Sequence, residues 1–400
     1  MKKSDPQILF IINGPININN SITISGGDIR LFEIIKHLTG YQIEILTTPN
    51  GKKLLQKFSV PHKKIHIIDY ILTNTIYSHL LIFLKSFFQL PSSLNNFQGI
   101  TYSSCEHLYD VLPALKLKLF NHCPWYAVYH NVYDYPWKEK RGNTPLIRRY
   151  IYWLNRWFSG IIIKTFANKI LAVSQNTKKR LIAIKKINPE KIKAVACGVD
   201  LPYINQINKK YQSEAGRQYD AAYLGRLDHA KGIIDLIQIW QHVCQQLPQA
   251  KLLIIGSGSS EFEQIIMSLI KKYNLIKNIN FVGTIYQPAK KYRLLNSAKL
   301  FVFPSHQENW GIAIGEAMAT KLPVLAYDLA KIKPIWKNGV QWISFANTTT
   351  FAQQIIRYLS DKKLRQQLIR RSSQLIKNYN WSDIARNEIV KSMSGNNKQS

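Results

Sequence analysis

The stretch 303–318 carries the chemistry that is easiest to interpret, because it places two carboxylates near the start of an expected helix. Seven residues separate Glu308 from Glu316. If a helix begins near Trp310, Glu308 lies in the loop at its positive end and Glu316 almost two turns inside it. Both carboxylates could then face one ligand, and the backbone N–H groups of 309–311 suit a polar or anionic group. Solvated charges would look similar, but apolar residues flank Glu316 and burying an unpaired carboxylate is costly, so we expect a functional pair.

A second loop offers positive charge. The expected strand 219–224 is followed by Gly225, Arg226 and, five residues later, Lys231 with Gly232 after it. Two cations on a strand-to-helix loop with flanking glycines suit a diphosphate, which needs positive charge and close backbone approach. The loop has no Walker sequence and is not a P-loop. An ordinary basic loop would look the same, so this loop alone does not decide the function.

Weaker signals follow other expected strands. Gly26 and Gly27 stand just before a helix and could form a turn that faces an anion. His130 ends a strand and is a candidate polar group at the ligand edge of its sheet, although a lone histidine there is more often structural. Residues 256–261 resemble a dinucleotide-binding loop but lack its third glycine, which argues against a Rossmann cofactor site.

Short apolar runs alternate with helical patterns along the whole chain, which predicts a parallel α/β architecture. The expected strands are 8–12, 43–47, 99–103, 125–130, 169–174 and 193–197 in the first half, and 219–224, 251–255, 279–282, 300–303 and 323–326 in the second. We predict two Rossmann-like, doubly wound domains that face each other across a cleft, with strand-to-helix loops lining it.

One segment is a candidate boundary between the domains. Residues 201–218 are polar and lack periodicity, as a linker would. We therefore expect an N-terminal domain over 1–204, a C-terminal domain over 205–377 and a last helix over 378–396.

Composition excludes several classes of protein. A chain of 400 residues that is 46% hydrophobic can form two packed domains and is not disordered. Its four cysteines are scattered without C-x-x-C spacing, which argues against a disulfide framework and a cysteine zinc site and fits a reducing cytosol. We find no signal peptide and no apolar run long enough to span a membrane, so a cytoplasmic protein is expected.

The formal net charge of +31 is unusual and is spread evenly over both halves of the chain. Compositional drift towards lysine explains most of it, and attraction to an anionic membrane surface or to phosphate-bearing ligands is a second contribution. Nucleic acid is not an expected partner, because no basic stripe with interleaved aromatic residues and no known reader motif occurs.

Two segments could contact lipid. Residues 147–161 predict a basic amphipathic helix, which could lie at a membrane interface but is more simply packed on the first sheet. Residues 76–88 are apolar nearly all round, which suits either lipid contact or a buried helix.

Taken together, the motifs resemble the retaining GT-B glycosyltransferases of the large "glycosyl transferases group 1" family. The strong part of the resemblance lies in the second half, at 223–227 with 231–232, 253–258, 281–283 and 303–326. The weaker part consists of Gly26-Gly27, His130, 172–174 and 198–200. Residues 379–381 look like the family's tail, where a last helix returns to the first domain.

The resemblance implies a role for each candidate residue. Arg226 and Lys231 would hold the diphosphate of the donor and help the nucleotide leave, while Glu308 would bind hydroxyls of the transferred sugar and Glu316 those of the ribose. His130 would sit near the reacting sugar on the acceptor side. The other residues placed at the donor are Gly26, Gly27, Gly225, Asn309, Trp310 and Gly311.

The resemblance also implies the reaction. The first domain would bind the acceptor and the second a UDP- or GDP-linked sugar, with retention of configuration and with no metal or other cofactor. Two fixed cations can neutralise a leaving diphosphate, as a metal does elsewhere. One departure is local: where the family has a Gly-Gly turn and a Glu, this chain has Ala330, Lys331 and Pro334.

We therefore expect a hexosyltransferase at the inner face of the cytoplasmic membrane. Its acceptor would be a glycan, lipid-linked in the favoured interpretation, in the synthesis of the cell envelope or of a surface polysaccharide. The alternative is an inactive GT-B scaffold that binds sugar nucleotides or serves as a partner subunit. The presence of Arg226, Lys231, Glu308 and Glu316 argues against such decay.

Overall fold

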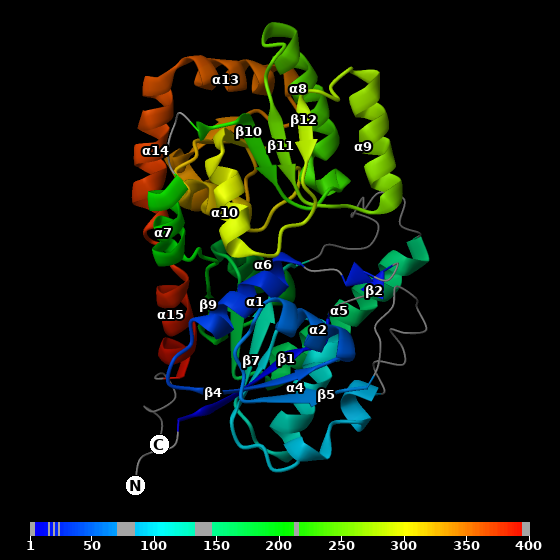
Figure 1. Ribbon diagram of the computed structural model, residues 1–400. Helices are drawn as coiled ribbons and strands as arrows, with labels where there is room; N and C mark the ends of the chain where they lie inside the picture. The colour runs from blue at the N-terminus through cyan, green and yellow to red at the C-terminus, as the bar shows by residue number, and fades with distance from the viewer. Residues whose placement is uncertain are drawn as a thin grey trace. The chain divides into compact units, whose positions relative to one another are not determined.

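The structure is a computed structural model that describes residues 5–14, 17–18, 21–22, 25–69, 85–132, 146–211 and 216–393 (Figure 1). The chain divides into two compact units. The first consists of Met1–Cys197 and Ser382–Ser400, and the second of Gly198–Trp381. Each unit is built on one parallel sheet with helices on it, so the predicted pair of Rossmann-like α/β folds is confirmed.

The first unit contains a seven-stranded sheet in the order β5-β4-β1-β6-β7-β8-β9. Its strands are β1 (Gln7–Ile12), β4 (Gln42–Thr47), β5 (Lys64–Ile67), β6 (Ile100–Ser103), β7 (Trp125–Tyr129), β8 (Lys169–Ala172) and β9 (Ile192–Ala194). Its helices are α1 (Gly26–Lys36), α2 (Pro49–Lys57), α4 (Leu108–Phe120), α5 (Leu146–Phe166), α6 (Gln175–Lys185) and most of α15 (Trp381–Met393). The short strands β2 (Asn17–Ile18) and β3 (Ser21–Ile22) pair antiparallel.

Helices cover both faces of this sheet because the side chains of β1 alternate between them. Leu9 and Ile11 belong to a buried cluster that includes residues of α4, α5 and α6. Phe10 points to the other face, where its ring lies 4.9 Å from that of Tyr102, whose hydroxyl contacts Arg30 of α1. Burial on both faces explains why β1 reads as an unbroken apolar run.

The second unit contains a six-stranded parallel sheet in the order β12-β11-β10-β13-β14-β15. Its strands are β10 (Tyr219–Leu224), β11 (Leu252–Ile255), β12 (Ile279–Phe281), β13 (Ala298–Phe303), β14 (Val324–Tyr327) and β15 (Val340–Ile343). Its helices are α7 (Leu201–Tyr211), α8 (Ile233–Gln246), α9 (Ser260–Lys272), α10 (Pro288–Asn296), α11 (Ile312–Ala319), α12 (Lys333–Trp336), α13 (Thr348–Ser360) and α14 (Lys362–Ile376).

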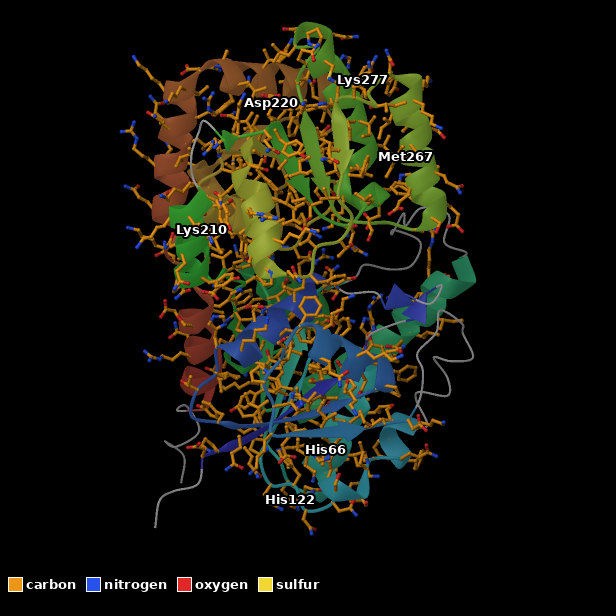
Figure 2. All side chains as sticks on the ribbon, viewed as in Figure 1. His66, His122, Lys210, Asp220, Met267 and Lys277 are labelled. Atoms are coloured by element: carbon orange, nitrogen blue, oxygen red, sulfur yellow. The ribbon has the colours of Figure 1, made fainter. Side chains whose placement is uncertain are left out.

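The first unit contains buried polar side chains that pair with one another, in addition to its apolar core. At the β5 edge of the sheet, His66 (labelled in Figure 2) lies 2.6 Å from Glu44 Oε2 through Nε2 and 2.7 Å from Ser93 Oγ through Nδ1. On the face covered by α1, the Arg30 guanidinium and the Tyr102 hydroxyl both bond to the carboxylate of Glu388 on α15. The three residues are at most 2% exposed, so this contact fastens the end of the chain into the first unit.

The segment interpreted as a linker is partly helical, so that prediction is wrong over 201–211. Helix α7 buries Ile204 and Asn208, which are four residues apart. Asn208 donates to the carbonyl of Ala319 at 2.8 Å and accepts from Asn296 Nδ2 at 3.0 Å. Because a hydrogen-bonded asparagine fills a core position of this helix, the sequence shows no apolar periodicity there. This explains why the helix was not predicted.

The amphipathic helix expected over 147–161 is the longer helix α5, which buries Ile163 and leaves Trp157 41% and Phe158 50% exposed. Of the other segment considered for lipid contact, residues 76–84 lie outside the described residues. In the part of the chain that the structure describes, no helix has the length and apolar character needed to cross a membrane.

Candidate active site

The loop between β13 and α11 places Glu308 at the carboxyl end of a central strand. Helix α11 begins at Ile312, two residues later than expected, and its N-cap Gly311 adopts a left-handed conformation (φ 76°) that glycine tolerates. Trp310 is buried, and its carbonyl accepts a hydrogen bond of 2.7 Å from Trp336 Nε1. The backbone around 309–311 is therefore held by packing, which keeps the loop in place.

Glu308 and Lys231 are brought together across 77 residues of sequence. Lys231 Nζ forms an ion pair with Glu308 Oε1, and Ser305 Oγ donates to the same oxygen at 3.1 Å. The Glu308 side chain is 9% exposed and that of Lys231 20%, so the pair is mostly shielded but reachable from solvent. A carboxylate and an ammonium at one strand edge can bind sugar hydroxyls and a phosphate respectively.

Gly232 is the reason that these two loops can touch. It has a positive φ of 65° at the end of a short 3₁₀ turn, His229–Lys231. A Cβ atom at Gly232 would lie 1.7 Å from the carbonyl oxygen of Pro304, which no neighbour could relieve without moving backbone. The side chain of Asp228 fixes the turn by accepting from the backbone N–H of Lys231 at 3.0 Å.

Arg226 lies on the same loop but is not part of this pair. Its guanidinium is 65% exposed and pairs with Asp228 Oδ2 at 3.2 Å. The preceding Gly225 donates its N–H to the carbonyl of Ile255 on the neighbouring strand. The structure therefore places both predicted cations on one loop, with Lys231 anchored and Arg226 open to solvent.

Glu316 is nearly buried on α11, with 9% of its surface exposed, and two residues of α10 partner it. Lys291 Nζ forms an ion pair with Glu316 Oε1, and the hydroxyl of Tyr292 donates to the same oxygen at 3.1 Å. Sequence reasoning did not identify Lys291 or Tyr292. They lie on a different helix, and only the packing of α10 and α11 beside β13 makes them neighbours.

The first unit holds a second cluster at the carboxyl end of its sheet. The backbone N–H of His130 donates to Glu106 Oε2 at 3.0 Å, and its ring Nε2 lies 2.9 Å from the carbonyl oxygen of Ser104. A Cβ atom at Gly27 would meet the His130 ring at 2.9 Å, so the ring rests on the first turn of α1. Gly26 begins that helix, with Ser25 as its N-cap. The structure thus brings together the predicted residues of this half.

Asp110 is a residue of this cluster that the sequence did not reveal. It is fully buried and accepts hydrogen bonds from the backbone N–H of Asn13 at 2.8 Å and from Ser104 Oγ. Desolvation raises the pKa of this carboxyl to about 7, against the opposing effect of those hydrogen bonds. Desolvation also raises the pKa of Asp28 on α1, while its hydrogen bonds with Ser25 oppose the shift.

The stretch that departs from the family pattern is a turn that leads into α12. Lys333, the first residue of α12, pairs with Asp328 directly after β14. Neither residue contacts Glu308 or Glu316 through a described hydrogen bond or ion pair.

Comparison with known proteins identifies the family. The family model described as "Glycosyl transferases group 1" matches residues 205–375, and that described as "Glycosyltransferase Family 4" matches residues 25–202. An uncharacterized glycosyltransferase of Methanocaldococcus jannaschii is 27% identical over 55% of this chain and 58% of its own length. The capsular polysaccharide biosynthesis glycosyltransferase CapM of Staphylococcus aureus is 24% identical over 56% of this chain and 60% of its own. The matches thus span less than two thirds of these relatives.

Solved structures show the same fold. The Anabaena protein HepE in complex with UDP and glucose superposes with a TM-score of 0.74 at 15% identity, over 97% of this chain and 99% of HepE. WaaG, a glycosyltransferase involved in lipopolysaccharide biosynthesis, superposes with a TM-score of 0.66 at 13% identity, over 96% and 99% of the two chains. The two family models together span most of the sequence, and both units have the matching fold. The chain belongs to the group 1 (family 4) glycosyltransferases of the GT-B fold.

Proposed function

We propose that this protein is a retaining hexosyltransferase that uses a nucleotide-diphosphate sugar as donor. The observation that carries the proposal is the contact of Lys231 with Glu308, since two loops far apart in sequence converge to place an ammonium and a carboxylate at one strand edge. Family membership supports a nucleotide-sugar donor, and HepE, with the same fold, has been solved with UDP-glucose.

Cationic and anionic side chains would hold different parts of the donor. The ammonium of Lys231 and the exposed guanidinium of Arg226 neutralise the diphosphate and stabilise it as it leaves. Glu308, released in part from Lys231, accepts hydrogen bonds from the hydroxyls of the transferred sugar. Glu316 does the same for the ribose, while Lys291 keeps its charge compensated.

His130 and Gly27 would serve the acceptor side and the phosphates respectively. Both lie in the first unit, at the carboxyl end of its sheet, where parallel α/β folds bind ligands. Contact with the carbonyl of Ser104 orients the His130 ring, as a group that must meet a reacting sugar requires.

We further propose a glycan acceptor, lipid-linked and used in envelope or surface-polysaccharide synthesis, at the inner face of the cytoplasmic membrane. Two relatives support this pathway by name, CapM in capsular polysaccharide and WaaG in lipopolysaccharide biosynthesis. The net charge of +31 and the exposed aromatic side chains of α5 suit an anionic membrane surface.

A thermal-shift panel of UDP, GDP, ADP and dTDP tests the donor assignment. A ligand that binds only the folded state raises the melting temperature with its saturation. We expect one nucleotide, UDP or GDP, to stabilise the wild type and to lose most of this effect in Glu316→Gln. The exposed Glu261→Gln on α9 is the matched control and should respond as the wild type does. Failure of all four nucleotides to stabilise the wild type would contradict the proposal and favour an inactive scaffold that serves as a partner subunit.

A further inference from the structure

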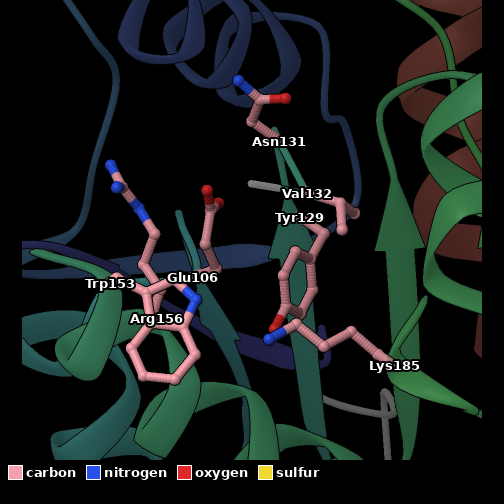
Figure 3. Close-up of a pocket in the computed structure, with 7 residues that line it drawn as sticks. All are labelled: Glu106, Tyr129, Asn131, Val132, Trp153, Arg156 and Lys185. Carbon is pink, nitrogen blue, oxygen red and sulfur yellow. The ribbon is translucent and has the colours of Figure 1, made fainter. Parts of the chain in front are cut away.

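A small pocket in the first unit is lined by residues that include Tyr129, Lys185 and Glu106 (Figure 3). Its volume is about 10 Å³, which is room for about one water molecule. A water molecule can bond to the Tyr129 hydroxyl there, and no substrate group fits. The pocket therefore carries no further function, in contrast to a polar cluster of the second unit that lies beside the candidate site.

This cluster consists of His306, Asp235 and Tyr327. His306 Nε2 lies 2.9 Å from Asp235 Oδ2, and the hydroxyl of Tyr327 donates to the same oxygen at 2.9 Å. Burial opposes the ionisation of Asp235, but the hydrogen bonds from His306 and Tyr327 outweigh it and lower the pKa of this carboxyl. Asp235 is therefore an anion near neutral pH, and Nε2 of His306 is the nitrogen that donates to it.

The backbone of His306 makes a second contact with the same connection, which runs from β10 to α8. The carbonyl oxygen of Ala230 accepts hydrogen bonds from the N–H of His306 at 3.0 Å and from that of Gln307 at 3.1 Å. Asp235 lies in the first turn of α8. His306 thus holds the connection at Ala230, just before Lys231, and again at Asp235, four residues after it.

The loop that makes these contacts also carries Glu308, two residues beyond His306. The ion pair of Lys231 with Glu308 therefore keeps its geometry only while this loop stays on the turn that carries Lys231. A lysine side chain is long and flexible, so the reach of its ammonium depends on where its backbone is held. Contacts on both sides of Lys231 fix that backbone.

The ring of His306 is held by packing as well as by Asp235. Its centroid lies 5.3 Å from that of Phe345 and 6.1 Å from that of Tyr327. The side chains of His306 and Asp235 are 35% and 16% exposed. A pair this close to solvent adds little to stability, whereas a ring with a fixed direction can hold one loop against another.

We propose that His306 is a positioning residue for the donor: together with Asp235 it holds the turn that carries Lys231 against the loop that carries Glu308. The inference rests on the proposed function, because it assigns a residue to the recognition of the diphosphate that this function requires. A diphosphate then meets an ammonium whose backbone is already fixed, which lowers the entropic cost of binding.

Calorimetric titration of UDP and GDP, and of their nucleosides uridine and guanosine, tests this role. His306→Leu removes the hydrogen-bond donor, whereas the amide nitrogen of His306→Gln takes the place of Nε2. Lys299→Met is the matched control. Lys299 pairs with Asp220 at 2.9 Å and joins the same two strands, β10 and β13, at their amino ends.

We expect the wild type to bind one diphosphate more tightly than its nucleoside. In His306→Leu this advantage should fall about fivefold while the Kd of the nucleoside is unchanged, because Glu316 and its partners lie on other elements. His306→Gln and Lys299→Met should keep the advantage of the wild type. A purely structural role would lower the melting temperature of His306→Leu and leave the ratio of the two Kd values as it is.

Hydrogen exchange followed by mass spectrometry tests the contact without any ligand. The N–H groups at positions 306 and 307, which bond to Ala230, should exchange faster in His306→Leu than in the wild type. They should exchange at the wild-type rate in His306→Gln and in Lys299→Met. Asp235→Ala removes the other partner and should reproduce both effects of His306→Leu, so the test does not depend on the folding of one variant.

The outcomes separate this inference from the donor assignment. Unchanged exchange in His306→Leu and Asp235→Ala, or a diphosphate advantage that survives in both, would overturn the positioning role alone. An equal loss of the advantage in Lys299→Met would overturn it too, because the effect would not be local. A wild type that binds neither UDP nor GDP would contradict the proposed donor, and this inference would fall with it.

Discussion

Carboxylates are paired with cations in both units, but in two different settings. In the first unit Glu388 meets Arg30 and Tyr102, and all three are at most 2% exposed. In the second unit Glu308 and Glu316 each meet one lysine that is 20% exposed. A fully buried network can only be opened by unfolding, whereas a partner at the rim can be exchanged for a ligand. This difference in burial distinguishes the structural network of the first unit from the pairs of the second unit that we propose to bind the donor.

The largest effect is expected from breaking the buried network. Glu388→Ala leaves the Arg30 guanidinium buried without a counter-charge and should lower the free energy of unfolding by about 3–5 kcal/mol. Urea denaturation measures this loss. Asp328→Ala, which removes the partner of Lys333 in a pair whose side chains are 35% and 50% exposed, is the matched control and should cost less than about 1 kcal/mol. Similar losses in the two variants would contradict the distinction.

Asp110 sharpens the comparison, because this buried carboxyl has hydrogen bonds but no cation in its described contacts. Its pKa is raised from the ordinary value of 3.8 to about 7 in the folded protein. Between these values the folded state keeps a proton that the unfolded chain has lost, so stability should fall as pH rises from about 4 to about 7. The change is on the order of a few kcal/mol.

Asp110→Asn should remove this part of the pH dependence. Denaturation at pH 4.5 and 7.5 checks it, with the exposed Asp383→Asn as control. If Asp110→Asn and the wild type lose the same stability between the two values, the buried carboxyl does not titrate as described.

Lys231→Met tests the second kind of pair, in which a partly exposed lysine can exchange its carboxylate partner for a ligand. The variant removes the ammonium proposed to neutralise the leaving diphosphate, so the rate of nucleoside diphosphate release from the sugar donor should fall about 100-fold. Stability should change much less than in Glu388→Ala, because the pair reaches solvent. Lys271→Met on the exposed part of α9 is the control. An unchanged rate would show that Lys231 does not take part in catalysis.

Glu316→Gln should have the smallest effect, about a tenfold rise in the Kd of the nucleoside diphosphate. The amide keeps the size of the side chain and one acceptor but loses the charge that pairs with Lys291 and that we propose binds the ribose hydroxyls. Calorimetric titration measures the Kd. A loss of affinity in Glu316→Gln that appears equally in Glu261→Gln would show that the effect is not local.

The central strands of both sheets could be predicted from the sequence, because strands buried on two faces form unbroken apolar runs. Of the edge strands of these two sheets, β9 and β12 were also predicted, whereas β5 and β15 were missed. Lys64–Ile67 is partly exposed and carries Lys64 and His66, and Val340–Ile343 is half-buried at its two middle positions. An edge strand is covered on fewer sides, so its composition carries a weaker signal.

The candidate site could be predicted only where its residues follow strands. Lys231 and Glu308 lie in the loops that follow β10 and β13, which are neighbours in the sheet, so their contact follows from topology. Lys291 and Tyr292 lie on the helix that precedes β13. Their contact with Glu316 depends on helix packing, which no spacing in the sequence encodes.

The central claim is that the cations of the second unit recognise a diphosphate. Calorimetric titration of the stabilising nucleoside diphosphate and of its free nucleoside, into the wild type and into Lys231→Met, tests it most directly. We predict that the wild type binds the diphosphate at least about tenfold more tightly than the nucleoside. In Lys231→Met this advantage should largely disappear while nucleoside binding is unchanged. Equal affinities in the wild type, or an advantage that survives in Lys231→Met, would contradict the account.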